Sequence, residues 1–165
     1  MLLSLQVVIR GEGPNKSNGL LFESLQADMA TEVADGPLYL PGLRPGIGGQ
    51  SDIIELFEVS FDDVRTANPP PPPPRPRAAV AANLEAVHAE FARLIDSGFR
   101  DAAIWLSQRP LDRLDACRAQ GVAADVYVWA IIDDNMMDLD DIPHEFLAEC
   151  GRLGLSVTIH THVGD

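Results

Sequence analysis

Six consecutive prolines, Pro69–Pro74, constrain this 165-residue chain more than any other feature of its sequence. They open the segment 69–77, PPPPPPRPR, and proline cannot donate a backbone hydrogen bond, so neither a helix interior nor a central strand can pass through it. Such a run favours extended polyproline II, a spacer of roughly 25 Å at about 3.1 Å per residue. We therefore expect a linker between an N-terminal unit, residues 1–68, and a domain formed by residues 78–165. A PxxP ligand for a proline-recognition domain is the alternative interpretation.

Helix and strand patterns alternate after the linker, which predicts a sheet with packed helices and an α/β (or α+β) fold. The helices end at Gly98, Gly121 and Gly154, since glycine commonly closes a helix. The expected elements are a helix over 78–97, a strand over 102–107, a helix from Pro110, a strand over 124–132, a helix over 143–153 and a strand over 155–162. The strand 124–132 is nearly all apolar, which predicts burial on both of its faces.

The N-terminal unit has a weaker pattern. An apolar run over 2–10 predicts a strand, and apolar residues at i+4 spacing predict a helix over 20–33. A short strand at 38–40 and a loop rich in glycine and proline over 41–50 follow. Ser51 is a candidate N-cap, so we expect a helix from Ile53 onward, although the same residues could form a strand. Whether the first strand joins the sheet of the C-terminal domain is left open.

The net charge of −13, from 12 basic and 25 acidic residues, argues against direct binding to nucleic acid or to an anionic membrane. A basic protein partner is the natural electrostatic complement. Two cysteines without a CxxC motif, no signal-peptide pattern and no apolar stretch of membrane-spanning length lead us to expect a cytoplasmic protein. The sequence makes no prediction of its oligomeric state.

An acidic loop over 133–141, DDNMMDLDD, is the candidate binding site. Five aspartates close together repel one another unless solvent, a cation or a basic partner compensates them. The two methionines add adaptable apolar contact within the same loop. The predicted binding residues are Asp133, Asp134, Met136, Met137, Asp138, Asp140 and Asp141. The alternative is that Asp140 or Asp141 only caps the following helix.

His160 and His162 form the one candidate metal pair, because alternate residues of a strand point to the same face. No third ligand has a recognisable spacing, so we expect no metal and no cofactor. His88-Ala89-Glu90 matches half of a zinc deaminase motif, but the P-C-x-x-C half is absent. No residue has the sequence context of a catalytic nucleophile, and we expect a binding protein rather than an enzyme.

The C-terminal part resembles small bacterial immunity-type and other α/β proteins of bacterial conflict systems. The resemblance covers about a quarter of the chain, as an apolar strand, an acidic loop, a helix of the form PxEFLxxxGxLGL and a closing strand. The matching residues are Pro143, Glu145, Phe146, Leu147, Gly151, Leu153, Gly154 and Leu155. The segment PGIGGQSDIIELF is similar to accessory domains of the same systems. The resemblance implies a fold and a protein-binding role, not an active site.

Together these features predict an acidic protein-binding module, an immunity-type or adaptor protein. Two alternatives stay open. One is a metal-dependent hydrolase that uses His160, His162 and carboxylates of the acidic loop. The other is a non-catalytic subunit of a larger assembly, tethered by the proline tract.

Overall fold

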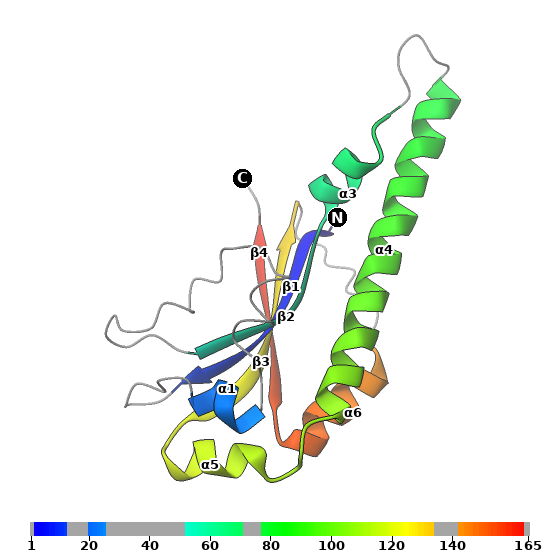
Figure 1. Cartoon of the computed structure of the whole chain (residues 1–165). Coiled ribbons are helices and arrows are strands. Elements are labelled where there is room, and N and C mark those ends of the chain that lie inside the picture. The colour runs from blue at the N-terminus through cyan, green and yellow to red at the C-terminus, as the bar shows by residue number, and fades with distance from the viewer. Residues whose placement is uncertain (1, 13–19, 26–51, 71–76, 134–141, 164–165) are drawn as a thin grey trace.

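The computed structural model describes residues 2–12, 20–25, 52–70, 77–133 and 142–163 (Figure 1). The elements are β1 (Leu2–Glu12), α1 (Leu20–Leu25), β2 (Asp52–Ser60), α3 (Phe61–Ala67), α4 (Arg77–Ser107), α5 (Arg113–Ala119), β3 (Ala123–Ile132), α6 (His144–Leu153) and β4 (Ser156–Val163). The strands form one mixed sheet, so the predicted α/β fold is confirmed. None of the described helices is both long and apolar enough to cross a membrane.

The strand order β2-β1-β3-β4 brings the two parts of the chain into one sheet. β1 pairs antiparallel with β2 on one side and with β3 on the other, and β3 pairs parallel with β4. The first strand therefore joins the C-terminal strands, which the sequence left open. Residues 71–76 of the predicted linker lie outside the described residues. The elements before and after them share a sheet and a hydrophobic core.

The helix expected from Ile53 is wrong, because this segment is strand β2. Ile54 and Val59 pair with Ile9 and Leu5 of β1 and bury their side chains on the same side of the sheet. An irregularity in the register lies between these two pairs, so the spacing of the apolar residues imitates a helical period. Pairing with β1, which is distant in sequence, decides in favour of the strand.

The strand expected over 102–107 is also wrong, because α4 continues without a break through Gly98 to Ser107 (Figure 1). Ala102, Ala103 and Leu106 are buried at helical spacing against the core. Gly98 does not end the helix: its missing side chain makes room for the ring of Phe57 from β2. A glycine that looked like a helix stop is therefore a packing residue.

The other two glycine stops are confirmed. Gly121 follows α5 and Gly154 caps α6, both at positive φ, 74° and 70°. After each glycine the next amide bonds back to a helix carbonyl, from Val122 to Cys117 and from Leu155 to Cys150. Such closures satisfy helix-terminal carbonyls before the chain enters the following strand. The strands β3 and β4 begin within two residues of these two glycines, close to where the sequence predicted them.

All described helices cover one face of the sheet. Their buried side chains join two clusters with Leu5, Val7, Ile9 and Val59, and with the alternate β3 residues Val126, Val128 and Ala130. The opposite face carries the intervening side chains of each strand, and no described helix covers it. On this helix-free face Trp129 is 44% exposed and Ile131 is 39% exposed, so the predicted burial of β3 on both faces is wrong.

Candidate functional site

Of the predicted acidic loop, only Asp133 is described. It follows β3 at an exposed bend. The other predicted binding residues, Asp134, Met136, Met137, Asp138, Asp140 and Asp141, lie in 134–141, outside the described residues. The loop connects the end of β3 to α6, so it begins where Ile131 lies on the helix-free face. Its binding role stays a prediction.

The histidine pair lies on β4, with both residues on the helix-free face beside Trp129 and Ile131 of β3. The ring of His160 stacks on two aromatic rings, with centroid distances of 5.4 Å to Tyr127 and 5.1 Å to Trp129. No group of three potential metal ligands occurs within the described ranges. The geometry of His160 is that of a member of an aromatic stack.

The strand register shows which residues lie side by side across the helix-free face. Glu58 of β2 lies beside Gln6 of β1, Gln6 beside Trp129 of β3, and Trp129 beside His160 of β4. Acid, amide, indole and imidazole thus follow one another across the sheet. At about 4.8 Å between strands, the acid lies roughly 10 Å from the indole. A ligand that contacts both must span two strand spacings.

A second row reinforces the pattern. Glu55 of β2, Val8 of β1 and Tyr127 of β3 are neighbours, and the guanidinium of Arg10 lies 5.7 Å from the centre of the Tyr127 ring. Tyr127 therefore contacts both a cation, Arg10, and the ring of His160. The centre of the face is aromatic, and its β2 side is acidic.

Of the two carboxylates of this face, Glu55 is partly buried and Glu58 is more exposed, and partial burial raises the pKa of both. Gln6 Nε2 donates a 2.7 Å hydrogen bond to Glu55 Oε2, which partly offsets the increase for Glu55. Neighbouring Glu58 acts in the opposite direction and raises the pKa of Glu55 further. The negative charge of Asp63 likewise adds to the raised pKa of Glu58. Both carboxylates would be stabilised by a cation that approaches this side of the sheet.

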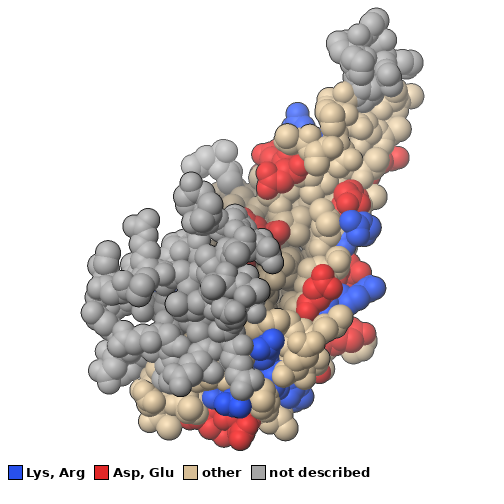
Figure 2. All heavy atoms as spheres, in the orientation of Figure 1, with Lys and Arg blue, Asp and Glu red and all other residues tan. Residues whose placement is uncertain are grey.

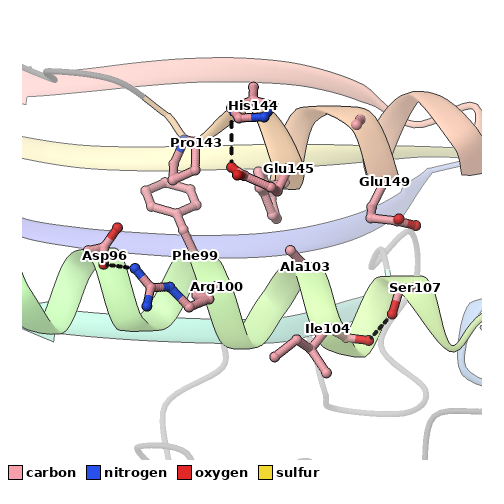
Figure 3. A pocket seen from close by; sticks show the side chains of 12 residues that line it. Asp96, Phe99, Arg100, Ala103, Ile104, Ser107, Pro143, His144, Glu145 and Glu149 are labelled. Atoms are coloured by element: carbon pink, nitrogen blue, oxygen red, sulfur yellow. Dashed lines mark hydrogen bonds and ion pairs between the residues drawn. The ribbon is translucent and has the colours of Figure 1, made fainter.

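A groove of about 680 Å³ lies on the other side of the molecule, between α4 and α6 (Figure 3). Phe99 and Phe146 line it, with ring centres 5.1 Å apart. The polar groups of α4 bond within that helix: Arg100 pairs with Asp96 at 2.7 Å, and the Ser107 hydroxyl donates to the Ile104 carbonyl. These contacts hold the rim in place and leave no nucleophile beside a base within the described lining.

The surface charges of α4 are similarly paired along the helix. Glu90 and Arg93 form an ion pair at 2.7 Å, and Asp96 and Arg100 form another one turn further on. Figure 2 shows acidic and basic side chains next to one another along the long helix. Exposed pairs at this spacing contribute little to stability, but they neutralise the helix surface. Glu55 and Glu58 on β2 differ from them, since no ion pair is described for either.

Both cysteines belong to the core. Burial raises the pKa of the Cys150 thiol to about 12. Cys117 is buried as well and lies 3.2 Å from the hydroxyl of Ser24 in α1. A thiol with such a pKa is protonated at neutral pH and is a poor nucleophile. The two side chains pack as small apolar groups.

Comparison of the chain with protein-family models, with curated proteins and with solved structures found no match.

The aromatic and acidic residues of the helix-free face were not predicted as a site, because β3 was expected to be buried on both faces. A signal for them is present in the sequence. In Asp125-Val126-Tyr127-Val128-Trp129, side chains that can meet water alternate with valines. This alternation is typical of a strand with one covered and one open face. The near-continuous apolar character of the segment hid it.

Proposed function

We propose that this chain is an acidic protein-binding module that captures a basic partner through the helix-free face of its sheet, as an immunity-type or adaptor protein does. The observation that carries the proposal is the exposure of Trp129 at the centre of this face, in one row with Glu58, Gln6 and His160. A half-exposed indole held by a stacked neighbour is a rigid anchor of the kind that dominates many protein interfaces.

The carboxylates of β2 lead us to expect a positively charged group on the partner. Burial makes the ionised forms of Glu55 and Glu58 unfavourable in the free protein, which is why the pKa of each is raised. An arginine or lysine from a partner would compensate that cost. The net charge of −13 adds long-range attraction, which speeds the encounter with a basic protein more than it tightens the final complex.

The aromatic centre supplies the apolar part of the contact. Trp129 and Ile131 are neighbours on the same face of β3, and both are more than a third exposed. An arginine side chain can lie flat on the indole, while an aliphatic residue can cover Ile131. The partner we expect therefore presents a cation and an apolar group about 10 Å apart, the width of two strand spacings.

The acidic loop 133–141 is the second part of the proposed interface, because it starts from the end of β3. In this proposal the loop acts at long range and the helix-free face acts in the bound complex. Changing Asp138, Asp140 and Asp141 to asparagine should slow association and weaken its salt dependence. The dissociation rate should change little, since rim charges act mainly on association.

The direct test is capture of proteins from the native host on the immobilised chain, followed by rate measurements with the captured protein after purification. Trp129→Ala and the double variant Glu55→Gln with Glu58→Gln probe the two halves of the face. We expect each to weaken binding by roughly tenfold or more, mainly through faster dissociation.

Matched controls make comparable changes at exposed positions outside the helix-free face. Leu111→Ala removes an exposed apolar side chain, and Glu85→Gln with Asp101→Asn removes two exposed charges from α4. Binding by both controls should equal that of the unmodified chain. The proposal is wrong if the captured protein is acidic, or if the face variants and the controls bind equally well.

A further inference from the structure

Within the described part of the chain, no strand pairs with the outer side of β4, which is an edge of the sheet. β4 pairs with β3 in an unbroken register from Ser156 to Val163, and no other described strand lies beside it. The backbone N–H and C=O groups on its outer side can therefore accept another strand. An exposed edge of eight residues is long enough to template such pairing unless something protects it.

Nothing in the composition of β4 protects this edge. Its sequence, SVTIHTHV, contains no proline and no aspartate, glutamate, lysine or arginine. The opposite edge strand, β2, has two protecting features that β4 lacks: its pairing is irregular near Val8, and it carries Glu55 and Glu58. Bulges and charges are the devices that keep strand edges apart, so β4 is the edge suited to pairing.

Apolar side chains on the helix side of β4 are left uncovered. Ile159 and Val163 are 44% and 47% exposed, although they point to the face that helices cover elsewhere in the sheet. Their β3 neighbours on that same face, Val128 and Ile132, are buried. The core therefore does not cover Ile159 and Val163, although Val157 nearer the start of β4 packs against it.

Leu147 is an exposed apolar side chain on α6, the helix that precedes β4. It is 42% exposed, and its position on the helix is turned away from the side that meets α4, where Glu149 and Arg152 lie. Ile159 and Val163 are thus exposed apolar side chains of the outer strand itself, and Leu147 is another on the helix that precedes it. We call Ile159, Val163 and the β4 backbone the β4 edge.

We infer that the β4 edge binds a second copy of this chain, by antiparallel pairing of the two β4 strands into one eight-stranded sheet. The distribution of charge on the chain favours a second copy as the partner. Each copy carries −13, so two copies repel one another wherever carboxylates meet, and β4 is a strand without any. A strongly basic partner would gain nothing from this neutral edge, whereas a second copy gains apolar cover without placing like charges together.

Symmetry fixes the arrangement. Antiparallel edge pairing of two identical strands requires a two-fold axis normal to the sheet, so the helices of both copies lie on one side. Ile159 and Val163 of each copy then lie on the helix side of the joined sheet, next to the β4 strand of the other copy. The helix-free faces join into one surface, with a Trp129 on each side of the axis. The association does not depend on the proposed function, since it uses other side chains.

The mass of the full-length chain in solution, measured by sedimentation over a range of concentrations, tests the inference. The unmodified chain should reach twice the monomer mass. Ile159→Lys with Val163→Lys should raise the dimer dissociation constant by at least about tenfold, because each lysine would lose its water in the contact. Ile104→Lys with Leu111→Lys changes the charge equally at exposed apolar positions away from β4 and should dimerise normally.

Hydrogen exchange of the unmodified chain supplies a test that needs no variant. Amides of Ser156–Val163 should exchange more slowly at a concentration where the dimer forms than in dilute solution, and β2 amides should not change. A monomer at every concentration overturns the inference. So does a dimer that leaves β4 exchange unchanged, or protection of β4 that appears only when a different protein is added. Loss of capture by Trp129→Ala with dimerisation intact would separate this result from the proposed function.

Discussion

At the scale of the residue, Glu55 shows a conflict between stability and binding. Its carboxyl group accepts a hydrogen bond from Gln6, yet burial raises its pKa from the usual 4.5. A raised pKa means that the folded protein holds this proton more tightly than the unfolded chain does. The resulting stabilisation is present at low pH and is lost as the pH rises through the raised pKa.

We therefore expect Glu55→Gln to raise the melting temperature at pH 7, because glutamine keeps an acceptor for Gln6 and carries no charge. The gain should vanish below about pH 4, where the carboxyl is protonated in both states. Melting curves of both proteins from pH 3 to pH 8 measure this. Glu85→Gln, at an exposed site on α4, is the control. A lower melting temperature for Glu55→Gln at pH 7 would contradict the prediction.

The two cysteines give a second prediction at this scale. Cys150, with a pKa raised by burial to about 12, and the buried Cys117 should not react with a thiol reagent at pH 8 while the protein is folded. Labelling should begin only as denaturant unfolds the chain. Rapid stoichiometric labelling of the native protein would show that the core around them opens locally.

At the scale of the element, α4 is held to β2 by the contact between Gly98 and Phe57. A β-carbon at Gly98 would come within 3.0 Å of three ring carbons of Phe57, which also packs on Phe99 with ring centres 5.0 Å apart. The ring cannot move without disturbing that second contact. Overpacking of this kind typically costs about 1–3 kcal/mol, more than the roughly 1 kcal/mol that alanine gains over glycine in a helix.

Gly98→Ala should thus lower the free energy of unfolding, measured in urea. Gly151→Ala makes the same chemical change in α6, where a β-carbon would meet nothing within 4 Å. There only the helix propensity changes, so we expect a gain of about 0.5–1 kcal/mol. Equal effects of the two substitutions would mean that the Phe57 contact does not limit α4.

The C-terminal end of α4 is fixed by an arginine from α6. Arg152 donates to the carbonyls of Leu106 at 2.7 Å and Arg109 at 3.0 Å, and α4 has no basic residue of its own in its last turn. Arg152→Met keeps most of the side-chain volume but leaves these carbonyls without that donor. We expect a loss of about 1–3 kcal/mol in urea unfolding.

Arg93→Met is the comparison for Arg152. It breaks an exposed pair with Glu90 and should leave the free energy of unfolding almost unchanged. A similar loss for both arginines would indicate that the carbonyl contacts of Arg152 contribute no more than a surface ion pair. A large loss for Arg152 alone supports its role in joining α4 to α6.

At the scale of the whole molecule, the central position of β1 governs cooperativity. β1 pairs with β2 and with β3, and Leu5, Val7 and Ile9 belong to the same cluster as Phe146 and Leu153 of α6. Neither side of the proline tract can then keep its core when the other unfolds. We expect one unfolding transition, with the same midpoint by circular dichroism, tryptophan fluorescence and cysteine labelling. Two separated midpoints would favour two independent units.

Local chemistry of the sequence was sufficient for several elements. The apolar runs of β1, β3 and β4 predicted strands, and Gly121 and Gly154 marked the ends of α5 and α6. These features depend on neighbours within a few residues, since a left-handed cap or an alternating strand is specified locally. The α/β class follows from their order along the chain.

Tertiary contacts decided the rest. Ile54 and Val59 became a strand because β1 offers them partners, and Gly98 stayed within a helix because a phenylalanine from another element needs its space. The helix-free face with Trp129 arises only when four strands from separate parts of the chain align in register. The sequence by itself determined which residues are apolar, acidic or able to adopt positive φ. Pairing of strands distant in sequence determined which face of the sheet each side chain occupies and which side chains it contacts.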